Sequence, residues 1–366
     1  MIVKSIKLKN YRNYESLHFT FDDKINILYG DNAQGKTNIL EALYLLGTTK
    51  SHRKTKDRDL IQFGCEESHV EIVVLKNDTE YVIDMHLKKN SPKGIAINKV
   101  PIRRAGELFG MIYFVFFSPE DLNIIKDAPS ARRRFMDLEL SQLDKVYLSN
   151  LSNYNRIINQ RNHLLKDINI QNNISKKNLL ETLDIWDMQL VEYGNRIIKE
   201  REKFISELNK IIFEIHKKLT NGREEISIVY EKDIGNYSLE EILKRNRKRD
   251  IRMKSTSSGP HRDDLHFKIG EMDVRQFGSQ GQQRTAALSL KLSEIKLVKE
   301  LTGNTPVLLL DDVLSELDKH RQNYLLESIR DTQTMITCTG LDEFVNHRFS
   351  MNKIFYVEDG RVTVKN

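Results

Sequence analysis

The chain has 366 residues, enough for two or three domains with a sizeable hydrophobic core. Its formal net charge of +6 suits a polyanionic partner, although with 30% charged residues a balanced, solvated surface explains this charge nearly as well. The only two cysteines, Cys65 and Cys338, lie far apart and in no metal-ligand spacing, as expected of thiols in a reducing compartment.

The N-terminal part is predicted to begin with strands. Residues 1–9 and 17–21 alternate between apolar and polar side chains, and residues 24–29 form a short apolar run. The N-terminus lacks the apolar core and cleavage site of a signal peptide, and no apolar run is long enough to span a bilayer. We therefore expect a cytoplasmic protein with no membrane partner.

Residues 30–37, Gly-Asp-Asn-Ala-Gln-Gly-Lys-Thr, match the phosphate-binding pattern G-x-x-x-x-G-K-[ST]. They lie between the strand 24–29 and a predicted helix over 38–46, whose N-terminal N–H groups would face phosphate. Lys36 would reach the β- and γ-phosphates, and the Thr37 hydroxyl would hold Mg²⁺. A turn that fits the pattern by coincidence is the alternative, but the flanking strand and helix favour a nucleoside triphosphate site. Its predicted residues are Gly30, Asp31, Asn32, Ala33, Gln34, Gly35, Lys36, Thr37 and Asn38.

The middle of the chain changes from strand to helix patterns. A hairpin is predicted over 69–88 and a buried strand over 111–117. From about 130 to 220, helical spacing predicts a hairpin of two helices, 139–168 and 183–219. The apolar stripe on the second helix is interpreted as an internal seam rather than a binding face. Residues 244–254, rich in Lys and Arg, are expected to form a solvated, mobile segment.

A second α/β portion begins near residue 255, with strands predicted over 306–310, 334–337 and 353–357. Asp311 and Asp312 follow the first of these, where a phosphate-loop protein needs carboxylates for Mg²⁺ and the attacking water. Asp311 would hold the Mg²⁺ shell and Asp312 would activate water; a polar strand-to-helix turn is the alternative. Because the helical hairpin separates Thr37 from Asp311, the site must be assembled from both ends of the chain.

Residues 279–284, Ser-Gln-Gly-Gln-Gln-Arg, begin a predicted helix and resemble the signature motif of ABC-type ATPases. Residues 313–318, with Ser315 and Asp318, resemble their D-loop. Four further segments, 9–14, 117–122, 132–137 and 258–264, narrow the match. Together they resemble the RecF family of bacterial DNA-repair proteins, over essentially the whole chain.

The resemblance implies an α/β fold: an ABC-type P-loop ATPase head (SMC/RecF-like) with an inserted α-helical lobe that contains a long helical hairpin. The expected domains are residues 1–125 and 251–366 for the two parts of the head and 126–250 for the lobe. ATP and Mg²⁺ are the implied cofactors, and Arg12 joins the implied ATP-binding residues. Ser279, Gln280, Gly281 and Gln282 would contact the ATP of a second protomer from a helix N-terminus. A Ser279 that only caps its own helix is the alternative.

The sequence departs from the wider ABC pattern at three places. Asp312 stands where most ABC heads carry Glu, and its shorter side chain predicts slow turnover. No clear switch histidine is present, so Thr337 or Thr339 could take that place. No glutamine occurs among residues 118–121, where the Q-loop would fall.

DNA contacts are predicted at basic residues, because Lys and Arg bind phosphates without a sequence motif. The segment 244–254 is a further candidate for contact with DNA. His261 and Arg262 could sense the nucleotide or DNA. For each site a solvated surface or a structural role, such as bracing the helical lobe, is an equal alternative. The named candidates are Lys50, Arg53, Lys54, Lys56, Arg132, Arg133 and Arg134.

We therefore expect a cytoplasmic, nucleoid-associated, ATP-dependent DNA-binding protein that dimerises around ATP. By resemblance, it would bind duplex DNA near single-strand gaps and promote recombinase loading with RecR-type and RecO-type partners. The rivals are a small-molecule kinase, which would leave the signature motif unexplained, and an architectural head with negligible hydrolysis.

Overall fold

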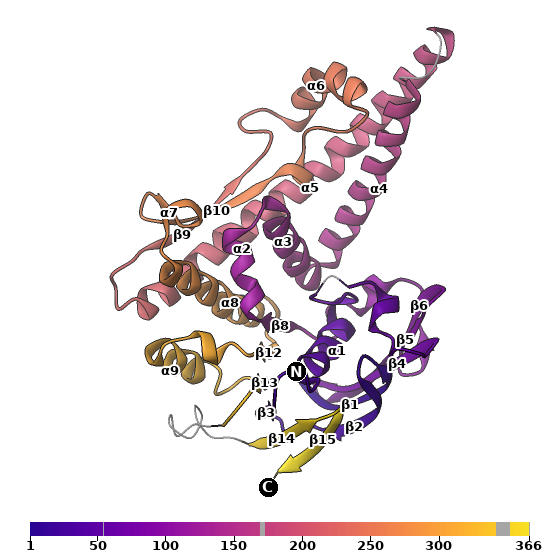
Figure 1. The fold of residues 1–366 in the computed structure, drawn as a ribbon. Helices are drawn as coiled ribbons and strands as arrows, with labels where there is room; N and C mark the ends of the chain where they lie inside the picture. The colour runs from indigo at the N-terminus through magenta and orange to yellow at the C-terminus, as the bar shows by residue number, and fades with distance from the viewer. Residues whose placement is uncertain (54, 169–172, 342–351, 366) are drawn as a thin grey trace. The chain divides into compact units, whose positions relative to one another are not determined.

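The computed structural model describes residues 1–53, 55–168, 173–341 and 352–365 (Figure 1). The chain folds into two compact units. Unit 1 comprises Met1–Asp121 and Leu288–Asn366, and unit 2 comprises Leu122–Ala287. The second boundary therefore falls later than the sequence predicted. Residues 251–287 belong to unit 2 because β10 (Asp264–Ile269) pairs antiparallel with β9 (Ile226–Glu231).

A six-stranded sheet in unit 1 joins both ends of the chain. Its order is β15-β14-β3-β13-β12-β8, with parallel pairing except for the edge strand β15. Strands β3, β8, β12 and β13 are buried at nearly every position, as expected where both faces of a parallel sheet are covered, whereas β14 and β15 are more exposed. Their bounds are β3 (Ile25–Tyr29), β8 (Phe114–Phe117), β12 (Val307–Asp311), β13 (Thr334–Cys338), β14 (Lys353–Glu358) and β15 (Arg361–Lys365).

The other sheet of unit 1 is antiparallel, in the order β2-β1-β4-β5-β6-β7. The predicted hairpin is present as β4 and β5, joined by Asn77 and Asp78 with φ of +48° and +59°. A two-residue loop with both residues in the left-handed backbone conformation matches the twist of the two strands. The bounds are β1 (Ile2–Tyr11), β2 (Tyr14–Thr20), β4 (Glu67–Lys76), β5 (Thr79–Lys88), β6 (Ser91–Ile97) and β7 (Val100–Pro101).

Helix α1 (Lys36–Thr48) contacts both sheets of unit 1, β8, β12 and β13 of one and β4 and β5 of the other (Figure 1). It is buried on nearly all sides, as expected of a helix whose residues from Ile39 to Leu46 are apolar except for Glu41. This packing fixes the start of α1 beside the ends of β3 and β12. Unit 1 also holds η1 (Asp57–Leu60), η2 (Ala105–Leu108), η3 (Pro119–Asp121), η5 (Leu314–Glu316) and α9 (Lys319–Ser328).

Unit 2 is built on the long helices α4 (Lys145–Ile168) and α5 (Asn173–Leu219), which lie side by side (Figure 1). The predicted first arm, 139–168, is divided at Asp144 between α3 (Pro129–Leu143) and α4. Buried Leu164, Leu165, Ile168 and Leu183 form part of the apolar seam. The unit also contains α2 (Leu122–Lys126), η4 (Pro260–Arg262), β11 (Met272–Asp273) and α7 (Val274–Phe277), and α8 (Gln280–Thr302) begins in it and continues into unit 1.

The prediction of a mobile segment over 244–254 was wrong. These residues lie mostly in α6 (Leu239–Met253), which starts with a reciprocal capping box between Ser238 and Glu241. Leu239 and Leu243 are buried, so apolar packing holds a helix whose other side chains are mostly charged. Among the described residues, no helix is long and apolar enough to cross a membrane.

Candidate nucleotide site

Three oxygen-bearing side chains meet at the carboxyl ends of neighbouring strands in unit 1. The Asp311 Oδ1 atom accepts hydrogen bonds from Thr37 Oγ1 at 2.8 Å and from Thr337 Oγ1 at 2.7 Å. The register places Asp311 opposite Thr337, and β13 also pairs with β3, which leads into the loop before Thr37. The two residues predicted to hold Mg²⁺ are thus brought together. A hydroxyl and a carboxylate are the hard oxygen ligands that Mg²⁺ prefers.

Two glycines of the loop are required by its geometry. Gly30 has a φ of +148°, and a Cβ there would lie 2.2 Å from the Val357 carbonyl oxygen. Gly35 has a φ of +110°, and its Cβ would lie 2.5 Å from Asn13 Nδ2. Gly35 is also the N-cap of α1, and none of the described side chains caps this helix. The Asn38 N–H donates to the Gly35 carbonyl oxygen, and the backbone N–H groups of Lys36 and Thr37 at this helix N-terminus are suited to an anion.

Lys36 is folded back into this loop. Its Nζ donates to the Gly30 carbonyl oxygen at 2.5 Å and to the Asp31 carbonyl oxygen at 2.7 Å. Burial lowers the pKa of Lys36, and the nearby carboxylate of Asp312 opposes that shift. The loop therefore holds a partly desolvated ammonium beside the N-terminus of α1, where phosphate oxygens could replace its two carbonyl partners.

Arg12 is anchored by Glu41, a residue that sequence reasoning missed. Its Nε and one terminal nitrogen donate to the two Glu41 carboxylate oxygens, both at 2.8 Å. Glu41 is fully buried on α1; hydrogen bonds from Arg12 and Ser51 lower its pKa although burial opposes them. Only its place in an otherwise apolar helix marks this carboxylate in the sequence. Arg12 lies in the turn between β1 and β2 and thus braces α1 against this turn.

Asn13 and Asn38 hold the outside of the loop. Asn13 Nδ2 donates to the Gln34 carbonyl oxygen at 3.0 Å, and Asn38 Nδ2 donates to Asn13 Oδ1 at 2.8 Å. The Gln34 side chain in turn accepts from the backbone N–H of Asp359 at 2.6 Å. In the sequence, Asn13 is one residue of the segment 9–14, and its contacts with Gln34 and Asn38 arise only in the folded chain.

Asp312 lies in the left-handed region, with a φ of +53°. Its N–H donates to Thr337 Oγ1 at 3.0 Å, and burial, with the neighbouring Asp311 charge, raises its pKa. Of the two residues predicted for the switch position, Thr337 contacts both aspartates, whereas Thr339 is exposed. In the segment predicted to be the D-loop, Ser315 Oγ donates to the Asp312 carbonyl oxygen and Asp318 caps α9.

The residues predicted as a signature motif lie at the start of α8, in unit 2. The Ser279 N–H donates to Gln282 Oε1 at 2.9 Å, and the Gln282 N–H donates to Ser279 Oγ at 3.2 Å. Ser279 therefore does cap its own helix, the alternative raised by the sequence. Ser279, Gln280 and Gly281 are nonetheless exposed, and a Cβ at Gly281 would meet only Ser279 Oγ, at 3.9 Å. Within the described part of the chain, no contact requires glycine at position 281.

The basic residues predicted to contact DNA divide into buried and exposed ones. Arg132 is 1% exposed and makes a bidentate ion pair with Asp264 at 2.6 and 2.9 Å, so its prediction as a DNA contact is corrected. Arg133 donates to the Asp263 carbonyl oxygen at 2.7 Å, and Arg134 is half-buried. The exposed candidates are Lys50, Arg53 and Lys56; Lys54 lies outside the described residues.

A buried arginine links two of the segments that sequence analysis singled out. Arg201 donates to Asp137 at 2.8 Å, to Asp263 at 3.0 Å and to the Pro260 carbonyl oxygen at 2.7 Å. It therefore ties residues 132–137 to residues 258–264 within unit 2. In the sequence, Arg201 only interrupts the apolar stripe of α5.

His261 is held in the same network as a neutral ring. Its Nδ1 lies 3.0 Å from Tyr154 Oη and its Nε2 lies 3.2 Å from the Thr256 carbonyl oxygen. A neutral ring that accepts from Tyr154 and donates to Thr256 satisfies both contacts. Burial lowers the pKa of His261 to about 4. This environment gives His261 a structural role within unit 2.

Comparison with known proteins identifies the family. The model of the RecF/RecN/SMC N-terminal domain matches residues 2–363. A DNA replication and repair protein RecF from Lachnospira eligens is 60% identical over 366 residues, covering 100% of both chains. The chain belongs to the RecF family. A second RecF, from Agathobacter rectalis, is 60% identical over 364 residues, covering 100% of this chain and 99% of its own.

Solved structures agree with this family and with the predicted fold. A structure of the recombination mediator protein RecF with ATP, in the RecFOR pathway, is 36% identical. It has a TM-score of 0.92 and covers 100% of this chain and 98% of its own. The Smc head domain of Pyrococcus yayanosii is 15% identical with a TM-score of 0.58, over 100% of this chain and 97% of its own. The ABC-type ATPase head fold is therefore confirmed, in a family of DNA replication and repair proteins.

Proposed function

We propose that this chain is an ATP-dependent DNA-binding protein of recombinational repair and replication restart, and that ATP makes it dimerise. The observation that carries the proposal is the meeting of Thr37 and Asp311 beside an uncapped, glycine-bearing helix N-terminus. That arrangement offers N–H groups and Lys36 to phosphates. The ATP-bound RecF with the same fold supports ATP as the nucleotide.

The proposed metal is Mg²⁺, held by Thr37 and Asp311. When bound, the ion neutralises charge on the phosphates. Asp312 is the proposed base for the attacking water, with Thr337 holding its backbone in place. Because aspartate is one methylene shorter than glutamate, we expect hydrolysis to be slow and to act as a timing step. Asp31, Asn32 and Ala33 complete the proposed phosphate loop.

Dimerisation is supported by the exposed start of α8. Ser279 and Gly281 present a hydroxyl and an unhindered backbone at a helix N-terminus, a surface suited to an anion. We propose that Ser279, Gln280, Gly281 and Gln282 meet the ATP held by a second copy. Ser315 and Asp318, close to Asp312 in sequence, are proposed to lie at the same interface.

Duplex or gapped DNA is the proposed polyanionic partner. Lys50, Arg53 and Lys56 are exposed in one loop of unit 1, and phosphate contacts by such residues give sequence-independent, salt-sensitive binding. The RecFOR pathway of the solved relative supports RecO-type and RecR-type partner proteins and a role in recombinase loading. We propose that the protein acts in the cytoplasm, in association with the nucleoid.

The experiment that tests this function is ATP hydrolysis with and without gapped duplex DNA, on wild type, Lys36→Arg and Lys24→Arg. We expect DNA to stimulate hydrolysis in wild type and in Lys24→Arg, because Lys24 is exposed and lies one residue before β3. Lys36→Arg should lose hydrolysis while keeping some ATP binding. Equal turnover numbers for Lys36→Arg and wild type would contradict the assignment of Lys36 to the nucleotide site. Hydrolysis that DNA does not change, with a small molecule phosphorylated instead, would favour a kinase.

A further inference from the structure

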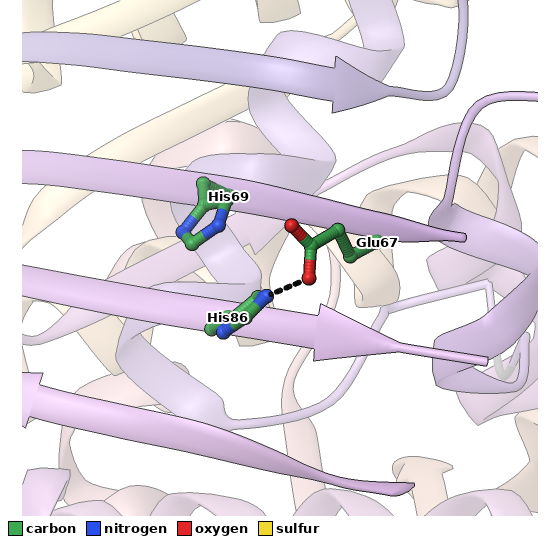
Figure 2. Close-up of side chains that lie close together, drawn as sticks. All are labelled: Glu67, His69 and His86. Carbon is green, nitrogen blue, oxygen red and sulfur yellow. Dashed lines mark hydrogen bonds and ion pairs between the residues drawn. The ribbon is translucent and has the colours of Figure 1, made fainter. Parts of the chain in front are cut away.

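Two histidines and a glutamate gather on the outer face of the antiparallel sheet in unit 1. His69 on β4 and His86 on β5 are directly opposite in the register, and Glu67 lies two residues before His69 on the same face (Figure 2). The alternate residues Ser68 and Val70 are fully buried, so these three side chains point away from the core. This cluster takes no part in the proposed nucleotide site.

The cluster contains suitable metal ligands. One donor atom from each of Glu67, His69 and His86 lies within 4.8 Å of the others. His86 Nε2 is 2.9 Å from Glu67 Oε2, and the two imidazole rings stack with centroids 3.9 Å apart. In a tetrahedral zinc site the ligand atoms lie about 3.3 Å apart, so small side-chain rotations would close the set. These side chains are partly exposed and can rotate.

The His86–Glu67 contact explains only part of this arrangement. Among the described residues, no hydrogen bond holds the ring nitrogens of His69, although its ring stacks on that of His86. On the far side of His86, the opposing residue in β6 is Gly94, where a Cβ would meet only His86 Cβ, at 3.9 Å. The face beside the cluster is therefore open on that side to an ion and its water ligands.

We propose that Glu67, His69 and His86 bind a divalent transition metal of the zinc class. Two imidazoles with one carboxylate suit Zn²⁺, Co²⁺ or Ni²⁺ better than Mg²⁺ or Ca²⁺, which favour oxygen ligands. Three protein ligands leave a position for water or for a group from a partner. The ion would join β4 to β5 near the end of the hairpin opposite its Asn77–Asp78 turn.

Charged side chains of both signs surround the Glu67–His69–His86 cluster on the same face of the sheet. Lys9 pairs with His69 across β1, and Lys88 pairs with Glu67 across β5, while Asp84 and Glu71 occupy the next positions on the same face. Lys7 lies opposite Glu71 on the same face, so three cations surround Glu67 and the two further carboxylates. Selectivity would come from the imidazoles, so that a transition metal, and not any divalent cation, is the expected ligand.

Equilibrium dialysis against Zn²⁺ tests the proposal on the full-length, tag-free protein without nucleotide, after treatment with EDTA. We expect wild type to bind one more equivalent than His69→Gln or His86→Gln, or to bind it at least ~10-fold more tightly. The matched controls are Glu71→Gln, on the same face and strand, and His18→Gln on β2. Both should bind as wild type does. Co²⁺ absorption should show the same loss in the two histidine variants.

The comparison between variants removes the contribution of other sites. Any Zn²⁺ held at Thr37 and Asp311, or by the cysteines, is common to all the proteins. Equal binding by wild type and the His69→Gln/His86→Gln double variant would overturn the proposal. The proposal would also be overturned if Glu71→Gln lost the bound equivalent of Zn²⁺ too. Binding would then depend on the negative charge of this face and not on the two histidines.

Discussion

The Thr37 hydroxyl donates to the Asp311 carboxylate at 2.8 Å, although 274 positions separate the two residues in the chain. The contact exists because β3 and β12 both flank β13 in one parallel sheet. Neither end of the chain contains this pair alone. The proposed nucleotide site therefore forms only when the first and last segments of unit 1 fold together.

Asp312→Asn is expected to lower the rate of ATP hydrolysis at least ~100-fold while leaving ATP affinity nearly unchanged. The amide cannot accept a proton from water, but Asn tolerates the φ of +53° as Asp does. Steady-state hydrolysis and titration with a fluorescent ATP analogue measure the two effects. Asp331→Asn, at an exposed turn, is the matched control. Unchanged turnover in Asp312→Asn would exclude it as the base.

The pH dependence of hydrolysis provides a second test of Asp312. Burial and the charge of Asp311 raise the Asp312 pKa, so its carboxylate becomes protonated at a higher pH than usual. As the pH falls through this raised pKa, the ionised base is lost and the turnover number drops. We expect the acid limb of the rate profile above the ordinary aspartate value of about 3.8. An acid limb that persists in Asp312→Asn would have another cause.

Gly30→Ala is expected to destabilise unit 1 by about 2 kcal/mol or more and to weaken nucleotide binding. The added Cβ would meet the Val357 carbonyl oxygen at 2.2 Å. Gly64→Ala is the matched control, since Gly64 also has a positive φ, +87°, but lies in open space. It should cost about 1 kcal/mol from its backbone conformation alone. Thermal unfolding of both variants gives the comparison; similar losses would show that the contact is harmless.

Arg132→Ala is expected to destabilise unit 2 by about 3–5 kcal/mol, because it leaves the Asp264 carboxylate partly buried without its ion pair. Urea unfolding followed by the fluorescence of Trp186, the only tryptophan and a residue of α5, reports on this unit. Arg196→Ala removes an exposed pair with Glu192 and an exposed contact over the Tyr193 ring, and should cost no more than about 1 kcal/mol. Loss of DNA affinity at unchanged stability would instead make Arg132 a DNA contact.

The stability of unit 2 is expected to fall as the pH is lowered from 7.5 to 5.5. His261 has a folded pKa of about 4 and an ordinary value of 6.5, so between them the unfolded chain binds the proton and the folded chain does not. The contribution of His261 is thus present above pH 6.5 and lost progressively below it, by about 1 kcal/mol at pH 5.5. His261→Gln, measured by the same Trp186 fluorescence, should reduce this dependence. An equal dependence in the variant would assign it to other groups.

Some of the site was predictable because short-range rules determine it. The spacing of Gly35, Lys36 and Thr37 marks a phosphate loop, and an apolar strand before Asp311 marks the neighbouring carboxylate. Both motifs follow from local backbone geometry. A phosphate loop needs a carboxylate close by, and this requirement predicted that the two motifs lie in the same sheet.

Other features depend on partners far away in the sequence. Arg132 looked like a surface cation, and only its pairing with Asp264 shows that it is buried. Arg201 interrupted an apolar stripe, and its role required knowing where Asp137 and Asp263 lie. The boundary after residue 287 depended in the same way on strand pairing of β9 with β10.

Light scattering with ATP, with ADP and without nucleotide tests the central claim, that ATP joins two copies through the start of α8. The proteins are wild type, Ser279→Arg and Ser152→Arg, whose exposed serine on α4 is a matched control. We expect dimers of wild type and Ser152→Arg with ATP alone, and monomers of Ser279→Arg throughout. A wild type that stays monomeric under every condition, with or without duplex DNA, would contradict the account.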